Sequence, residues 1–228
     1  MMRLRAPQLV FAAFTALAAF GALVVAMPGL GAQERLVDGV GDPAARAAIR
    51  ATVQQLEARG VPTAPLLTKV REGMAKQAPP ARIADAVAQL GGRLTVAHAA
   101  LAVATSSDEV AAGAGALQAG VGEGALRELR RRWTTAPLTV PLGVMTQMVA
   151  SGVPVARAVA QVRILLERGA TPSQLVAFTS AVQSDVAAGI APDVAMVLRA
   201  DAVAATGATT VSSPLGSPPT PPPLRPSP

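Results

Sequence analysis

Apolar residues recur along most of the chain at the three- and four-residue spacing of an amphipathic helix. No stretch shows the sustained apolar–polar alternation of a β-strand bounded by turns. The chain is therefore predicted to be all-α. The clearest helical sets are Ile83, Val87 and Leu90; Val144 and Met148; and Leu175, Val182 and Val186.

Glycine and proline divide this pattern into short pieces. Glycine ends a helix at low cost because it adopts the left-handed conformation, and proline suits the first turn of the next helix. Thr63, Thr139 and Thr171 are placed to cap the helices that follow them. The predicted fold is an array or bundle of short helices, which cover residues 42–59, 63–77, 80–103, 107–119, 123–135, 140–151, 155–168, 172–188 and 192–205.

Two of the glycine–proline junctions are nearly identical. The sequence Ala-Arg-Gly-Val-Pro at 58–62 recurs as Ala-Ser-Gly-Val-Pro at 150–154, and the match continues without a gap at an offset of 92 residues, as far as Pro80 and Pro172. We predict an internal duplication of a helix–turn–helix unit, although its spacing matches none of the named solenoid classes. The glycine-rich stretch 111–124 is either a hinge between the copies or a poorly packed connecting helix with tight Ala and Gly contacts, and the second interpretation is favoured.

The first 32 residues have the order of a secretory signal peptide. Arg3 and Arg5 precede an uncharged run, Leu9–Ala26, and small residues lead to Gln33. We predict cleavage after Ala32, or alternatively after Gly31, and export to the periplasm or the extracellular space of a bacterium. The alternative is that this run, which is nearly long enough to span a bilayer, stays as an inner-membrane anchor.

The rest of the chain is predicted to have three parts. Residues 33–41 are expected to form a flexible N-terminal segment, and residues 42–206 the helical repeat domain. From Gly207 onward Ser, Thr, Gly and Pro dominate, which predicts a disordered, polyproline II-like tail over 207–228. Such a tail serves as a docking peptide or a spacer, or it is a terminal tail without a specific function. The last interpretation is favoured.

The composition argues against most classes of catalytic and cofactor-binding site. A chain without cysteine builds no disulfide framework, thiol nucleophile or zinc cluster. The single histidine, His98, has no nucleophile and orienting acid near it in the sequence, so a structural role is favoured over a catalytic one. Aromatic residues make up only 2% of the chain, which argues against stacking platforms for single-stranded nucleic acid. We expect no catalytic residue, cofactor or metal.

The sharpest local feature is the run from Arg127 to Trp133. The candidate partner contacts are Arg127, Arg130, Arg131, Arg132 and Trp133. An acidic protein or anionic lipid headgroups would complement the positive charge of the arginines. Nucleic acid is the least favoured partner because the chain is predicted to be exported. The favoured interpretation is a purely structural one, in which the arginines form an exposed helix face near a helix C-terminus and Trp133 is anchored in the core.

These observations predict an exported, non-catalytic helical scaffold or protein-interaction module of the bacterial cell envelope, with an unidentified protein or peptide partner. The alternative is a membrane-anchored or membrane-surface protein that uses its N-terminal apolar segment and the arginine run. An enzyme that uses carboxylates alone is the least favoured hypothesis.

Overall fold

The computed structural model describes the backbone of residues 30–101 and 106–209, and the side chains of residues 34–101 and 106–200. Within these ranges the chain forms ten α-helices and no strand, which confirms the all-α prediction. The helices are α1 (Leu30–Asp38), α2 (Pro43–Glu57), α3 (Ala64–Ala75), α4 (Pro80–Leu101), α5 (Ser107–Gln118), α6 (Glu123–Arg132), α7 (Thr139–Ala150), α8 (Val155–Glu167), α9 (Pro172–Ala187) and α10 (Pro192–Thr209).

The nine helices predicted from the sequence correspond to α2–α10. The ends differ by a few residues: α6 ends at Arg132 because Trp133 leaves the helical conformation, with φ −120° and ψ 67°. Helix α10 continues to Thr209, past the predicted start of the tail at Gly207. The predicted signal run and most of the predicted tail lie outside the described residues.

The expectation of a flexible segment at 33–41 differs from the structure, in which α1 covers most of it. Val37 and Val40 are buried, and α1 packs against α2 and α3. The apolar pattern formed by Leu36, Val37 and Val40 is only about one turn long, which is too short to stand out in the sequence. The folded body therefore begins before residue 42.

Six helices end in the same hydrogen-bonded reversal. At Gly60, where φ is +68°, the backbone N–H of Val61 donates to the carbonyl of Leu56 at 3.0 Å, which is the Schellman motif. The equivalent bond closes the turn at Gly152 (φ +93°), where Val153 is the donor at 3.0 Å. Val61 and Val153 are both buried, so each turn also fixes a hydrophobic contact. Helices α3, α5, α8 and α9 end in the same way at Gln77, Gly120, Gly169 and Gly189.

The three predicted threonine caps behave differently. Thr171 forms a full capping box with Gln174 at the start of α9. Thr63 occupies the N-cap of α3 but makes no side-chain hydrogen bond to it. Thr139 is the first residue of α7, and Leu138 takes the N-cap position instead.

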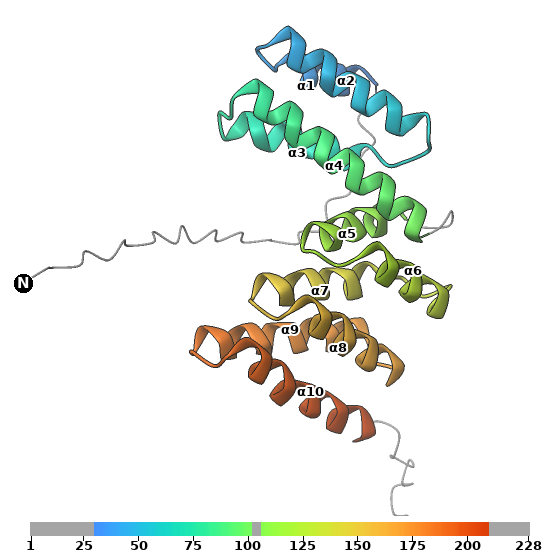
Figure 1. Ribbon diagram of the computed structural model, residues 1–228, viewed down its shortest axis with the longest axis vertical. Coiled ribbons are helices and arrows are strands. Elements are labelled where there is room, and N and C mark those ends of the chain that lie inside the picture. The colour runs from blue at the N-terminus through green and yellow to red at the C-terminus, as the bar shows by residue number, and fades with distance from the viewer. Residues whose placement is uncertain (1–29, 102–105, 210–228) are drawn as a thin grey trace, which may run out of the picture.

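The helices stack in two layers along one axis (Figure 1). Helices α2, α4, α5, α7 and α9 pack one on the next, and α1, α3, α6, α8 and α10 lie against them. The alternation between layers breaks once, because α4 and α5 are consecutive helices of the same layer. The stack begins at α1 and α2 and ends at α10 (Figure 1), so the molecule is an array and not a closed bundle.

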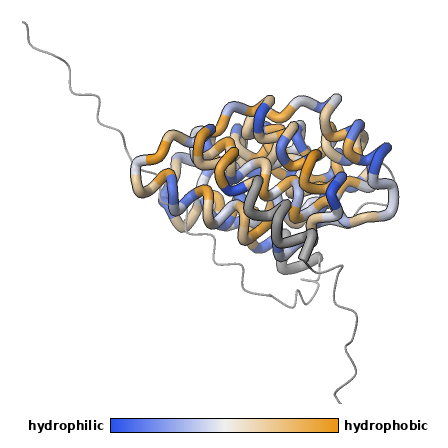
Figure 2. The backbone as a smooth tube through the Cα atoms, turned by 90° about the horizontal axis from the view of Figure 1, so that it is seen from below, coloured by the Kyte–Doolittle hydropathy of each residue, from blue (hydrophilic) through white to orange (hydrophobic). Residues whose placement is uncertain are grey.

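Mainly aliphatic side chains fill the space between the helices. Hydrophobic and hydrophilic segments are interspersed over the described part of the backbone (Figure 2). The glycine-rich stretch belongs to this packing, because α5 is a continuous helix between α4 and α7. A Cβ atom on Gly113 would lie 2.8 Å from Leu101 Cδ1 and 3.1 Å from Ala97 Cβ. The first part of the stretch is therefore a helix with tight Ala and Gly contacts, as favoured, but it is well packed and not poorly packed. The stretch is also not a single helix, because α5 ends at Gln118, Gly120 (φ +94°) lies in the turn and α6 starts at Glu123.

Candidate functional site at the arginine-rich edge

Helix α6 carries most of the arginine run on its outer side. Leu126 and Leu129 are buried, and α6 packs on α4 through this face. Arg127 and Arg131 are exposed. Since each residue turns the helix by about 100°, the five predicted contacts point in different directions and meet different surroundings.

Arg130 points into the molecule. Its guanidinium Nη2 donates to the Glu109 carboxylate of α5, and its Nη1 donates to the carbonyl oxygens of Trp133 (3.2 Å), Thr134 (3.1 Å) and Ala136 (3.4 Å). The side chain of Arg130 is only 15% exposed. It therefore holds the end of α6 and the loop after it, and the prediction that Arg130 contacts a partner is not supported, because its guanidinium is used within the molecule.

Glu109 completes this internal clamp. Its side chain is 7% exposed, and its Oε1 also accepts the backbone N–H of Leu138 at 2.8 Å. One carboxylate thus ties α5 to the end of α6 and to the start of α7. The role of Glu109 was not predictable from the sequence, because its partners lie 21 and 29 residues away in the chain.

Two of the exposed arginines form ion pairs with glutamates. Arg127 pairs with Glu123 one turn earlier on α6, an arrangement that contributes a few tenths of a kcal/mol. Arg132 reaches Glu167 on α8, with Nη2 and Oε1 3.2 Å apart.

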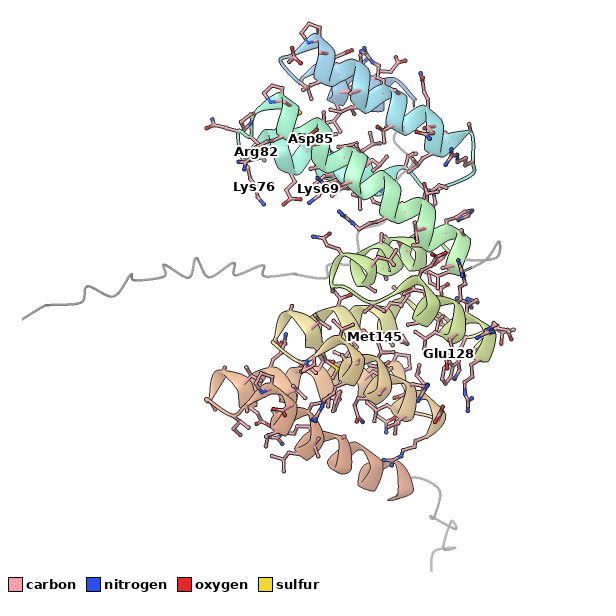
Figure 3. The ribbon with its side chains drawn as sticks, in the orientation of Figure 1. Lys69, Lys76, Arg82, Asp85, Glu128 and Met145 are labelled. Atoms are coloured by element: carbon pink, nitrogen blue, oxygen red, sulfur yellow. The ribbon has the colours of Figure 1, made fainter. Side chains whose placement is uncertain are left out.

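Arg163 of α8 extends this network to a second glutamate of α6. Its Nη1 lies 3.3 Å from Glu128, and its Nε lies 3.9 Å from Glu167. In Figure 3 Glu128 lies among the side chains at the outer end of α6. Most of the charge on this surface is therefore balanced within the molecule.

Trp133 is half-buried and packs against the core, as the favoured interpretation predicts. The guanidinium carbon of Arg132 lies 5.8 Å from the centre of its ring, within the range of a cation–π contact. Trp133 is the only tryptophan of the chain, so its fluorescence reports on this surface alone.

Arg131 and Arg168 remain without a charge partner. Both are exposed, and neither forms an ion pair with any residue of the described ranges. Arg168 follows Glu167 at the end of α8, so the Arg132–Glu167 pair lies beside both of them in the chain. We call the surface formed by Arg131, Arg132, Trp133 and Arg168 the arginine-rich edge. The place of Arg168 was not predictable from the sequence, because only the fold brings the end of α8 to the end of α6.

Two open clefts lie elsewhere. One, of about 390 Å³, lies between α3 and α5 and is lined by residues that include Lys69, Glu72 and Asp108. Hydrogen bonds from Lys69 and Lys76 lower the pKa of Glu72 from 4.5 to about 2, so this carboxylate stays ionised. The other, of about 240 Å³, lies among α1, α2 and α3.

Neither cleft has His98 in its lining. His98 is half-buried on α4, and its Nδ1 has no hydrogen-bond partner among the residues that the structure describes. Across residues 34–101 and 106–200, no three His, Asp or Glu side chains gather in a way that would hold a metal ion. None of the described helices is both long and apolar enough to cross a bilayer.

The chain matches no family model, no curated protein and no solved structure.

Proposed function

We propose that the protein is an exported, non-catalytic helical scaffold of the bacterial cell envelope that binds an acidic segment of a partner protein at the arginine-rich edge. The observation that carries the proposal is the exposure of Arg131 and Arg168, which have no ion-pair partner among residues 34–101 and 106–200, beside arginines that glutamates neutralise. Unpaired guanidinium groups are suited to bidentate contacts with carboxylates.

The architecture supports this proposal in a second way. A stack in which each helix contacts only near neighbours presents a broad, continuous surface, as helical repeat proteins do when they bind partners. The fold already positions the edge, because α6 is fixed by the Arg130–Glu109 clamp. The exposed arginines are thus held on a rigid base, which lowers the entropy cost of binding.

We also infer that α2–α4 and α7–α9 are two copies of one duplicated unit. In support, the middle helix of each set, α3 and α8, lies in the same layer, and the outer helices of each set lie in the other. The turns at Gly60 and Gly152 share their hydrogen bonds and their buried valine. The arginine-rich edge lies where α6, which belongs to neither copy, meets the end of α8 in the second copy.

Binding is tested with a short glutamate-rich peptide, followed by the fluorescence of Trp133. The expected result is saturable binding that weakens about tenfold in an Arg131→Glu/Arg168→Glu variant, because two favourable charge contacts become repulsive. Arg82→Glu on α4 is the matched control, since Arg82 is exposed and lies away from the edge (Figure 3). Equal binding by all three proteins would contradict the proposal.

The same variants separate the membrane alternative from the scaffold. Vesicles that contain an anionic phospholipid replace the peptide in the titration. Binding to the vesicles without binding to the peptide would favour a membrane-surface role. Mass spectrometry of the mature N-terminus tests export directly, because cleavage after Ala32 gives a chain that starts at Gln33.

A further inference from the structure

Glu167 occupies an unfavourable place for an acidic residue. It is the last residue of α8, where the partial negative charge of the helix C-terminus disfavours a carboxylate. The position 92 residues earlier, at the end of α3, is Ala75. The helix end itself therefore gives no reason for Glu167, and the contacts of its side chain explain it better.

The carboxylate of Glu167 is shared between two arginines. Its Oε1 lies 3.2 Å from Nη2 of Arg132 on α6 and 3.9 Å from Nε of Arg163 on α8. Arg132 belongs to the arginine-rich edge, and its side chain is 59% exposed. Glu167 thus occupies a guanidinium group that would otherwise be open to an acidic partner.

The pair between Glu167 and Arg132 can exchange without leaving either charge isolated. An exposed ion pair adds little stability, because water and salt screen it. If Arg132 is released, Arg163 still lies beside the Glu167 carboxylate. Arg132 in turn keeps its contact with Trp133, whose ring centre lies 5.8 Å from the guanidinium carbon, so it stays at the edge.

We propose that Glu167 is an internal competitor for the arginine-rich edge, and that an acidic segment bound there replaces the Glu167 carboxylate on Arg132. The inference rests on the proposed function and adds the residue that regulates the same site. Arg131 and Arg168 make the first contacts with the segment, because neither has an ion-pair partner in the described ranges. A further carboxylate of the bound segment then meets Arg132 at a high effective concentration.

The exchange favours partners with several acidic residues close together. A lone carboxylate gains little at Arg132, since it only replaces the carboxylate of Glu167 on the same guanidinium. A segment that Arg131 and Arg168 already hold gains the third contact as an intramolecular step. Glu167 also repels any acidic ligand that does not displace it. It therefore raises the number of acidic residues that a partner needs.

Calorimetric titration of the full chain with the glutamate-rich peptide tests the competitor. We expect Glu167→Gln to bind about fivefold more tightly than the unchanged chain, because Arg132 becomes free and a repelling charge is lost. Glu72→Gln on α3 is the matched control, since it makes the same change in net charge and Glu72 is 41% exposed. Its partners Lys69 and Lys76 lie away from the edge (Figure 3), so this variant should bind like the unchanged chain.

A double-mutant cycle tests whether Glu167 acts through Arg132. In an Arg132→Ala background, the gain from Glu167→Gln should shrink to less than about twofold, because no guanidinium remains to be released. A general effect of charge or folding would give the same gain in both backgrounds. Circular dichroism confirms that each variant is folded.

Three results would overturn the proposal. They are equal affinity of Glu167→Gln and the unchanged chain, an equal gain in Glu72→Gln, and an undiminished gain in the Arg132→Ala background. The Arg131→Glu/Arg168→Glu variant separates this failure from that of the proposed function. If it binds more weakly than the unchanged chain while Glu167→Gln binds equally, only the competitor is wrong. If the unchanged chain and all variants fail to bind, both proposals are wrong.

Discussion

Arg130 and Arg131 are neighbours in the sequence but belong to different regions of the molecule. Arg130 enters the clamp with Glu109, where the two side chains are 15% and 7% exposed. Arg131 lies at the arginine-rich edge, exposed and without an ion-pair partner in the described ranges. One step along a helix turns the side chain by about 100°, and here that step separates a residue that holds the fold from one that is free for a partner.

The difference matters because charge behaves differently in the two regions. Breaking a buried pair leaves an uncompensated charge in a poorly solvated place, which typically costs 3–5 kcal/mol. An exposed pair is worth about 0–1 kcal/mol, since water and salt screen it. The clamp should therefore dominate stability, and the edge should contribute little to it.

The largest effect is expected from Glu109→Ala. This change leaves Arg130 without its carboxylate and the backbone N–H of Leu138 without its acceptor, so the free energy of unfolding should fall by about 3 kcal/mol. Urea unfolding followed by circular dichroism measures it. Glu109→Gln is the control, because its amide oxygen still accepts from Leu138, and its loss should be smaller. Equal stability of the Ala variant and the unchanged protein would show that the clamp is not structural.

The next effect concerns the packing beside the clamp, where α5 meets α4. Gly113→Ala places a Cβ atom 3.1 Å from Ala97 Cβ, and that neighbour is fixed to the backbone, so we expect a loss of about 1–2 kcal/mol. Gly115→Ala meets only Thr146 Oγ1 at 3.9 Å and should gain about 0.5–1 kcal/mol from helix propensity. Opposite signs in thermal unfolding are the prediction, and a gain from both changes would contradict the close approach of α4 and α5.

These expectations show what the sequence could and could not predict. Helix boundaries were accessible because residues such as Gly60 and Gly152 need the left-handed conformation, which is a local property of the chain. The clamp was not accessible, since Glu109 and Arg130 are joined only after α5, α6 and α7 pack. Arg168 was hidden for the same reason, because the meeting of α6 and α8 is a property of the whole fold.

A smaller effect is expected at the edge itself. Arg132→Ala removes the 3.2 Å contact with Glu167, and both side chains are more than one-third exposed, so the loss should stay below about 1 kcal/mol. High salt screens this ion pair, so it should remove the pair's contribution to the stability of the unchanged protein. The Arg132→Ala variant lacks the pair and should not show this part of the salt effect. A loss as large as that of Glu109→Ala would mean that the edge is part of the structural core.

The smallest effect comes from Glu72, a second exposed site whose pairs resemble those of the edge. Its pKa of about 2 in the folded state lies below the usual 4.5, so its contribution is fully present above pH 4.5 and disappears as the pH falls towards 2. Because Glu72 is 41% exposed, solvent screening limits this contribution to a few tenths of a kcal/mol. Between pH 5 and pH 2, the free energy of unfolding of Glu72→Gln should fall slightly less steeply with decreasing pH than that of the unchanged protein. A steeper fall would be inconsistent with the Lys69 and Lys76 pairs.

The division of the arginine run is tested most directly by urea unfolding of Arg130→Ala and Arg131→Ala side by side. We predict that Arg130→Ala lowers the free energy of unfolding by about 3 kcal/mol, and that Arg131→Ala changes it by less than about 0.5 kcal/mol. Equal losses in the two variants, or a larger loss for Arg131→Ala, would contradict the separation of a structural clamp from a free arginine-rich edge.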